Sequence, residues 1–241
     1  MATCVEFNNV SKIFDRNDKQ ETEALKDISF TVQRGDIFGI VGESGSGKST
    51  IARLLTGLIP PTSGQILIEE KLLEARSGRL PKELIGRLQM VFQNPLESFN
   101  PRHTLGYGIG ESLLNKGLCK DEIRARVKEQ LILCGLTEDM AELYPHQVSG
   151  GQCQRAAIAR ALISDPDIIV CDEATSSLDV TVQKQIIELL SDLRAKKDIT
   201  IIFISHNLPL VEIFCDRGIV LQSGVLKGTF EATSSNLIEY F

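Results

Sequence analysis

The chain has 241 residues, of which 42% are hydrophobic, and a net charge of −6. This length suits one large or two small domains with a substantial core. The acidic balance argues against nucleic acid as the main partner, because such binding needs a basic face. No apolar run approaches the roughly 18 residues of a membrane span, and residues 1–7 lack the basic start and apolar stretch of a secretion signal. The six cysteines are scattered without a C-x-x-C pair, which favours reduced thiols in a cytosolic protein over a disulfide framework or a zinc site.

The first forty residues predict β structure. Short extended pieces are expected at 5–7 and 12–14, followed by a polar loop over 15–23. Residues 25–32 alternate apolar and polar side chains, which indicates a half-buried strand, and residues 37–41 form an apolar run typical of a buried strand.

A glycine-rich loop follows this buried strand and precedes an amphipathic helix. The loop consists of Gly42, Glu43, Ser44, Gly45, Ser46, Gly47, Lys48, Ser49 and Thr50. It matches G-x-x-x-x-G-K-[ST], in which glycines let successive backbone N–H groups face one anion and the helix N-terminus also favours phosphate. Lys48 is predicted to place its charge on the outer phosphates and Ser49 to give its hydroxyl to Mg²⁺. The strand before the loop and the helix after it favour a nucleotide site over a chance glycine loop.

The predicted secondary structure changes from mainly β to mainly helical in the middle of the chain. Prolines and glycines over 57–64 end the helix, and strands are expected at 65–69 and 88–92, whereas 70–87 is charged and broken. Residues 94–165 are expected to be helical, with loops at 94–102, 117–120 and 135–149. In the helix predicted over 121–133, Ile123, Val127 and Leu131 fall on one face. A helical subdomain inserted between strands is the simplest interpretation.

The β/α alternation then resumes. Apolar strands are expected at 168–171 and 199–204, a helix between them with an apolar face over 182–193, and a short helix at 208–214. Two short strands at 219–221 and 225–226 and a terminal helix over 232–241 complete the prediction. Apolar parallel strands alternating with helices imply a doubly wound α/β sheet whose ligand lies at the carboxyl ends of the strands.

Three of these strands end in residues suited to phosphate chemistry. Gln93 follows one strand, Asp172 and Glu173 follow a second, and His206 follows a third. Each alone is more typical of a helix cap, a surface pair or a structural side chain. Together they indicate a phosphoryl-transfer site. Asp172 and Gln93 are predicted to hold the metal ion, Glu173 to orient or deprotonate the attacking water, and His206 to donate a hydrogen bond to the outer phosphate.

A second possible phosphate-binding motif lies at the start of another predicted helix. It consists of Ser149, Gly150, Gly151 and Gln152. One nucleotide has no use for two cradles in one chain. We therefore expect the second cradle to serve a nucleotide bound to another subunit, in a two-fold or pseudo-two-fold dimer with two ATP molecules at its interface.

With these motifs in this order, the chain resembles the ATPase subunit of an ABC transporter over essentially its whole length. In the family's terms 42–49 is the Walker A loop, Gln93 the Q-loop glutamine, 168–172 the Walker B strand, Glu173 the catalytic glutamate and His206 the switch histidine. Residues 149–152 correspond to the signature motif and 176–179, ending in Asp179, to the D-loop. Phe14 stands where the family stacks a ring on adenine, with a core phenylalanine as the alternative. Val148 and Cys153 depart from the usual residues without removing a catalytic group.

The resemblance implies the ABC ATPase fold. This is a P-loop α/β domain with a mostly parallel sheet, an N-terminal antiparallel β part and an inserted helical subdomain. It further implies a single domain over 1–241, with 1–93 and 166–241 as the core and 94–165 as the helical subdomain. ATP and Mg²⁺ are the implied cofactors.

A finer resemblance points to the peptide and nickel importer group. It rests on Gln93-Asn94-Pro95, on 99–102, on Tyr144-Pro145-His146 and on 179–183. This implies a second, different ATPase subunit, two permeases and an extracytoplasmic solute-binding protein, with the chain at the cytoplasmic face of the membrane. The solute would be a peptide, nickel or a metal chelate. The chain end at Phe241 leans towards nickel or a metal chelate, and Phe99 departs from the leucine usual in the group.

Three other functions share some of these sequence features. An exporter subunit of the same superfamily is the main alternative. A soluble ABC ATPase acting on DNA or ribosomes is disfavoured because no heptads fill the stretch between Lys48 and Ser149. A P-loop GTPase is disfavoured because the chain has no N-K-x-D motif.

Overall fold

The computed structural model describes residues 2–15, 21–73, 79–176 and 178–232. The strands are β1 (Thr3–Asp15), β2 (Glu21–Gln33), β3 (Ile37–Gly42), β4 (Ser63–Ile68), β5 (Lys71–Leu72), β6 (Leu88–Val91), β7 (Ile168–Asp172), β8 (Thr200–Ser205), β9 (Arg217–Gln222) and β10 (Val225–Glu231). The helices are α1 (Lys48–Leu55), α2 (Pro95–Ser98), α3 (Leu105–Asn115), α4 (Lys120–Leu133), α5 (Gly150–Leu162), α6 (Val180–Lys197) and α7 (Leu208–Phe214). Three short 3-10 turns lie at Lys82–Leu84, Glu138–Glu142 and Pro145–Gln147.

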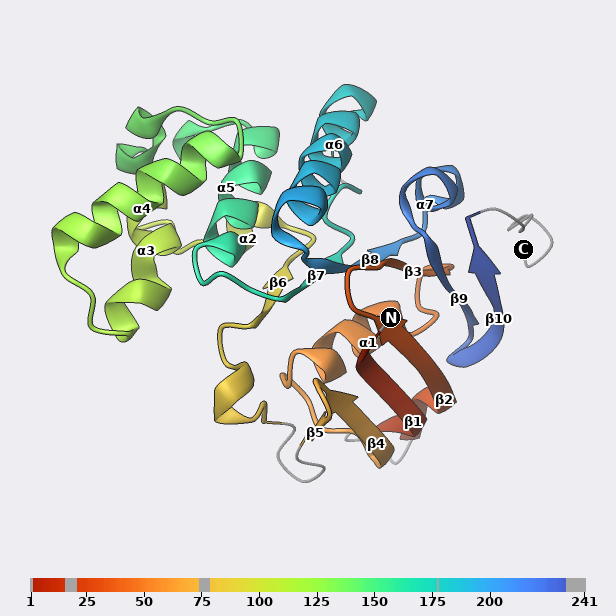
Figure 1. Cartoon of the computed structure of the whole chain (residues 1–241). Coiled ribbons are helices and arrows are strands. Elements are labelled where there is room, and N and C mark those ends of the chain that lie inside the picture. Colours follow the sequence, from red (N-terminus) through yellow and green to blue (C-terminus); the bar gives the residue numbers. More distant parts are fainter. Residues whose placement is uncertain (1, 16–20, 74–78, 177, 233–241) are drawn as a thin grey trace.

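A six-stranded sheet in the order β10-β9-β3-β8-β7-β6 forms the centre of the molecule (Figure 1). β9, β3, β8, β7 and β6 are parallel, and only β10 runs antiparallel to its neighbour. Every residue of β3 and β8 is buried. Both faces of these strands are therefore covered, as their apolar sequences predict.

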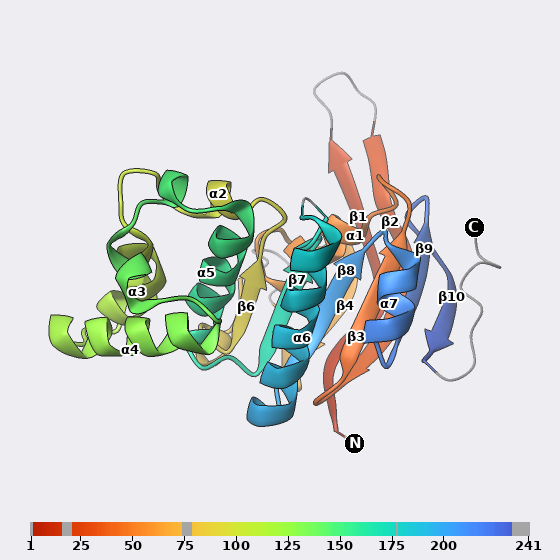
Figure 2. The same cartoon turned by 90° about the horizontal axis from the view of Figure 1, so that it is seen from above.

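The two faces of this sheet carry different covers. Val41 and Phe203 face a core shared with α6 and α7, whereas Ile40 and Ile202 face a core shared with α1 and the four-stranded sheet β2-β1-β4-β5. Figure 2 shows α6 and α7 side by side over the sheet. The α/β fold with an N-terminal antiparallel β part is as predicted, and the antiparallel sheet shares the second face with α1.

The helices α2 to α5 lie between β6 and β7 in the sequence and form a body beside the sheet (Figure 1). Ile123, Val127 and Leu131 are buried, which confirms the predicted apolar face of α4. The loop predicted over 94–102 is wrong in part, because α2 occupies Pro95–Ser98 with proline in its first turn, where its missing N–H costs no helical bond. Short 3-10 turns likewise interrupt the loop predicted over 135–149.

The N-terminal prediction needs two corrections. The pieces expected at 5–7 and 12–14 form one strand, β1, whose pairing with β2 passes through several register shifts, and residues 21–23 of the predicted loop belong to β2. The sequence does not show that β1 is one continuous strand, because β-bulges break its alternation of apolar and polar residues near Asn9, which has a φ of 51°. β10 continues to Glu231, beyond the predicted end at 226. The predicted terminal helix falls mainly on 233–241, outside the described residues.

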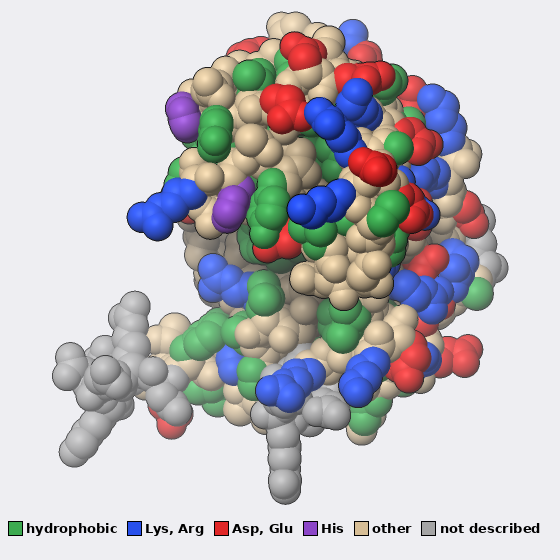
Figure 3. Space-filling view, turned by 90° about the vertical axis from the view of Figure 1, so that its left-hand side faces the viewer, with side chains coloured by type: hydrophobic (Ala, Val, Ile, Leu, Met, Phe, Trp, Pro, Cys, Tyr) green, Lys and Arg blue, Asp and Glu red, His purple; other side chains and the backbone are tan. Residues whose placement is uncertain are grey.

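The described helices include none that is both long and apolar enough to cross a membrane. Seen from the side of α3 and α4, the surface mixes Lys and Arg with Asp and Glu (Figure 3).

The six cysteines are all free, and five are buried in the two cores. Burial raises the pKa of Cys4 and Cys153 to about 11 and that of Cys134 and Cys171 to about 12, and it raises the pKa of Cys215 further. Only Cys119, immediately before α4, is exposed. Because the thiolate is the reactive form, the buried thiols should be inert.

We expect one thiol per native chain to react rapidly with Ellman's reagent at neutral pH, and all six after unfolding. A Cys119→Ser variant should lose the fast phase. A second fast thiol in the native protein would contradict the burial of the other five.

Candidate active site

The glycine loop joins β3 to α1 and turns tightly at two glycines. Gly45 and Gly47 have φ values of 81° and 104°, which disfavour any side chain. A Cβ at Gly47 would lie 2.7 Å from the Ala24 carbonyl oxygen of β2, and one at Gly42 would lie 2.2 Å from the Leu221 carbonyl oxygen of β9. The loop is therefore held against two neighbouring strands.

Lys48 begins α1 and lies under the loop with only 4% of its surface exposed. Its ammonium donates hydrogen bonds to the carbonyl oxygens of Gly42 and Glu43, at 2.8 and 2.7 Å. Burial lowers the pKa of Lys48, while the carboxylates of Glu173 and Asp172 act in the opposite direction. The site thus concentrates a buried positive charge beneath the loop.

Ser49 and Asp172 come from different strand ends and meet directly. The Ser49 hydroxyl donates to Asp172 Oδ1 at 3.1 Å. Asp172 is buried, and this burial raises its pKa, with the Ser49 hydrogen bond opposing the shift. A buried carboxylate next to a hydroxyl is an oxygen-ligand set that suits a hard divalent cation.

Glu173 holds its carboxylate between two further strand ends. Gln93 Nε2 donates to Glu173 Oε2 at 2.9 Å, and His206 Nδ1 lies 3.4 Å from Glu173 Oε1. The backbone of Glu173 is left-handed, with a φ of 48°, although its N–H still bonds to the Ile204 carbonyl at 3.0 Å. The structure therefore brings together the residues that the sequence placed at four separate strand ends.

A cavity of about 280 Å³ opens over the loop. Its lining residues are Ala24, Ser44, Gly45, Gly47, Lys48, Ser49, Thr50, Gln93 and Glu173. Gly42, Glu43 and Ser46 do not line it but form the loop behind it. The Ser46 hydroxyl is buried and has no protein partner, and a Cβ at Gly45 would meet no atom within 4 Å. An open cradle with a spare buried donor and a buried lysine fits a phosphate chain.

Phe14 stands apart from this cavity. It lies on β1, half-buried, with Lys12 Nζ 5.1 Å from the centre of its ring. It is therefore not the core phenylalanine of the alternative interpretation. Its predicted role against adenine stays a prediction.

Residues 149–152 and Asp179 also lie outside the lining of this cavity, within the part of the chain that the structure describes. Ser149 caps α5 in a reciprocal arrangement, accepting from the Gln152 N–H while its own N–H donates to Gln152 Oε1. Ser149 and Gly150 are exposed, and Asp179 caps α6 by accepting from the Val182 N–H at 3.0 Å. An exposed helix N-terminus of this kind is free to meet a ligand on another molecule.

Two contacts of the site were not expected from the sequence. Ala24 lines the cavity because β2 passes beside Gly47, which no local pattern signals. Ser176 accepts a hydrogen bond from Gln93 Nε2 at 3.4 Å and donates to the Glu173 carbonyl at 3.0 Å. Its place in the predicted D-loop was the only available sign.

The sequence is similar to known transport proteins along most of its length. It is 41% identical to the oligopeptide transport ATP-binding protein OppF of Haemophilus influenzae over 230 residues, which cover 91% of this chain and 69% of that protein. It is also 41% identical to OppF of Streptococcus pyogenes serotype M1 over 211 residues, covering 86% of this chain and 69% of that protein.

The fold has solved counterparts. The dimeric ATP-binding cassette MJ0796, in a post-hydrolysis state with ADP and Pi, has a TM-score of 0.84 and 30% identity, covering 96% of this chain and all of that one. CbiO1 of Clostridium perfringens, part of the ABC transporter complex cbiONQ, has a TM-score of 0.83 and 29% identity, covering 96% of this chain and 90% of that one.

Residues 25–176, more than half of the chain, match the ABC transporter family. This match begins on β2 beside the loop and ends just past Glu173, so it includes the glycine loop, Gln93, Asp172 and Glu173 but not Ala24 or His206. The chain therefore belongs to the ABC transporter family and is one of its ATP-hydrolysing cassettes.

Proposed function

We propose that this chain is the motor subunit of an ABC importer, which couples ATP binding and hydrolysis to solute uptake through partner permeases. The observation that supports it most is the Glu173 carboxylate, held between Gln93 and His206 beside the cavity over Lys48. This arrangement places a candidate base, two hydrogen-bonding partners and a buried cation at the carboxyl edge of one parallel sheet.

The proposed chemistry needs positioning and charge stabilisation more than covalent steps. The loop N–H groups and Lys48 hold the phosphates of ATP. Glu173 orients the attacking water and accepts its proton, while Gln93 and His206 fix the direction of the Glu173 carboxylate. His206 is exposed enough to turn towards the outer phosphate once ATP is bound.

We propose Ser49, Asp172 and Gln93 as the residues that would hold Mg²⁺. When bound, the ion would neutralise phosphate charge. The buried Ser49–Asp172 pair supports this role. Burial raises the pKa of Asp172 although the Ser49 hydrogen bond, Arg53 and Lys48 oppose the shift, so a bound cation would offset the unfavourable burial of this carboxylate.

We further propose that the chain works as a dimer, with Ser149, Gly150, Gly151 and Gln152 completing the ATP site of the partner and Asp179 lying at the shared interface. The exposure of Ser149, Gly150 and Asp179 away from the chain's own cavity supports this arrangement. The similar cassette MJ0796 is dimeric. We favour a second, homologous chain as the partner.

The solute and the membrane partners are proposed from the relatives. Their names favour a peptide as solute, with nickel or a metal chelate as the alternative. Two permeases and an extracytoplasmic binding protein would complete the importer, and the chain would lie against the cytoplasmic face of the membrane. The division into a core (1–93 and 166–241) and a helical subdomain (94–165) stays a prediction.

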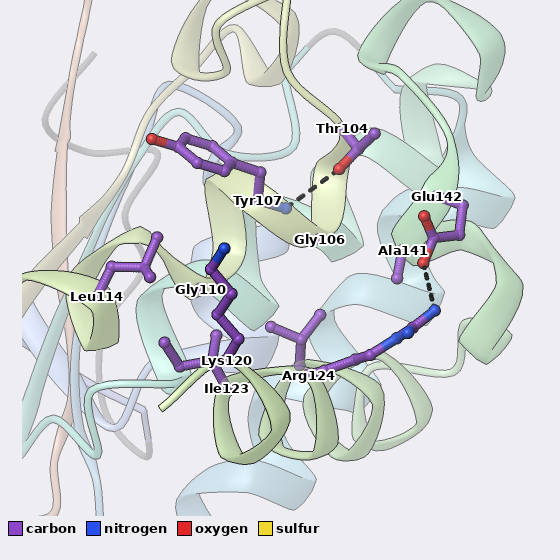
Figure 4. Close-up of a pocket in the computed structure, with 11 residues that line it drawn as sticks. Thr104, Gly106, Tyr107, Gly110, Leu114, Lys120, Ile123, Arg124, Ala141 and Glu142 are labelled. Carbon is purple, nitrogen blue, oxygen red and sulfur yellow. Dashed lines mark hydrogen bonds and ion pairs between the residues drawn. The ribbon is translucent and has the colours of Figure 1, made fainter. Parts of the chain in front are cut away.

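A groove of about 350 Å³ between α3 and α4 supports permease contact. Figure 4 shows Lys120 rising from α4 towards α3, which carries Tyr107 and Leu114, whereas Arg124 extends towards Glu142. The Arg124 guanidinium pairs with Glu142 at 3.1 Å, and Lys120 forms no ion pair within the described ranges. We propose that an apolar permease segment carrying an acidic side chain occupies it.

We expect Glu173→Gln to bind ATP with near wild-type affinity but to hydrolyse it at least about a hundredfold more slowly, because the amide cannot accept the proton. The variant should accumulate as an ATP-bound dimer, measured by size-exclusion chromatography with light scattering. If the variant alone stays monomeric with ATP, the measurement should be repeated with the homologous second chain that we propose as its partner.

Lys48→Ala serves as the matched comparison. Loss of the buried ammonium should abolish ATP binding, and the double variant Lys48→Ala with Glu173→Gln should not dimerise. Wild-type turnover in Glu173→Gln, or tight ATP binding by Lys48→Ala, would overturn the assignment of these residues.

We expect Asp172→Asn to separate stability from activity. The amide keeps an oxygen for the Ser49 hydroxyl, but it removes a carboxylate whose burial is unfavourable, so the melting temperature without nucleotide should rise by about 2–4 °C while Mg²⁺-dependent hydrolysis is lost.

The pH dependence of this gain checks its cause. The folded pKa of Asp172 lies above its ordinary value of 3.8, so the wild type loses stability as pH rises through the folded pKa. The difference in melting temperature should therefore grow from pH 4 upwards and be smallest where Asp172 is protonated. A variant less stable than the wild type at pH 8 would contradict this account.

A further inference from the structure

Arg160, near the end of α5, is a largely buried cation with an unusual set of partners. Its guanidinium donates to the Ser98 carbonyl oxygen at the end of α2 and lies 4.8 Å from the centre of the Phe99 ring. In the described part of the chain it forms no ion pair with a carboxylate. Burial lowers the pKa of Arg160, opposed by the nearby Glu111.

Phe99 is clamped from two sides. Only 4% of it is exposed, and a Cβ at Gly108 of α3 would lie 2.6 Å from its ring. Its ring therefore packs on bare helix backbone on one side and against Arg160 on the other. The cation and the ring attract each other more strongly when they are partly removed from water, and here the Phe99 ring is buried while Arg160 is partly buried.

The contacts of Arg160 with Ser98 and Phe99 connect the segment that follows Gln93 to helix α5. Pro95 begins α2 two residues after Gln93, whose amide holds the Glu173 carboxylate. Arg160 lies on the same helix as Gly150, about 15 Å further along at 1.5 Å per residue. Residues 94–99 therefore connect Gln93 to α5, the helix that Ser149 caps at its other end.

Arg155 on the same helix makes a useful contrast. It donates to the Cys134 carbonyl at 2.9 Å and to Gln185 Oε1 at 3.0 Å. It therefore fastens α5 to α4 and α6, but among the described residues it forms no hydrogen bond or ion pair with 94–99. Losing Arg155 should weaken the packing of α5 without touching the route from Gln93.

We propose that Arg160 is a positioning residue that couples the ATP site of its own chain to Ser149–Gln152, through its bond to Ser98 and its contact with Phe99. This deepens the proposed function and rests on it, since Ser149–Gln152 matter only if they act on a partner's ATP. Arg160 does not line the cavity over Lys48, so its role is to position other residues and not to act on the nucleotide.

The first test measures coupling inside one chain. In the Glu173→Gln background, kept dilute enough to be monomeric, MgATP should change the amide hydrogen exchange of residues 149–153 by about five- to tenfold. Arg160→Ala should abolish most of this response while ATP affinity stays within about twofold. Arg155→Ala should lower the melting temperature but keep the response.

The second test measures the consequence. At higher protein concentration, Arg160→Ala should need about tenfold more ATP for half-maximal dimerisation than the Glu173→Gln parent. Arg160→Lys, which keeps a donor for the Ser98 carbonyl, should recover part of the loss, and Phe99→Leu should fall between the parent and Arg160→Ala.

Each outcome decides the inference. It is overturned if Arg160→Ala keeps the exchange response, or if Arg160→Ala and Arg155→Ala lose it equally, since that would show a merely structural role. If the Glu173→Gln parent shows the exchange response but never dimerises with ATP, alone or with a homologous chain, the proposed function fails. The coupling between the ATP site and Ser149–Gln152 within one chain would then still be supported. If the parent shows neither, both fail.

Discussion

The parallel order β3-β8-β7-β6 is the constraint on which the site depends. Val41 pairs with Ser205, and Asp172 pairs with Ile204, so neighbouring strands end at nearly the same height. The loop after β3, His206 after β8 and Glu173 after β7 consequently emerge at one edge. A shift of one residue in any of these ladders would turn the strand's alternate side chains to the opposite face and separate the groups of the site.

Much of this could be predicted because parallel strands buried on both faces have a strong sequence signal. The apolar runs before Gly42, Gln93, Asp172 and His206 mark strands, and each ends in a residue whose chemistry suits phosphate. The sequence also predicts the apolar face of α4, because a helix shows its buried side through a regular spacing.

The parts that escaped prediction depend on contacts between distant segments. α2 is only four residues long and begins at Pro95, so its sequence resembles a turn. β1 is continuous but bulged, which breaks the alternation that identifies a strand. Ala24 and Arg160 have ordinary local surroundings, and only the folded chain places Ala24 beside Gly47 and Arg160 beside Phe99.

The left-handed backbone of Glu173 has a consequence for how this site persists over evolution. A glutamate with a φ of 48° costs about 1–3 kcal/mol relative to a relaxed residue. Glycine or asparagine would adopt that backbone more easily, so folding does not favour glutamate at this position. The role proposed for Glu173 as the base in hydrolysis would explain why it is kept there. A duplicated copy freed from selection for hydrolysis would be expected to lose this carboxylate early, while its fold and its capacity to bind nucleotide remained.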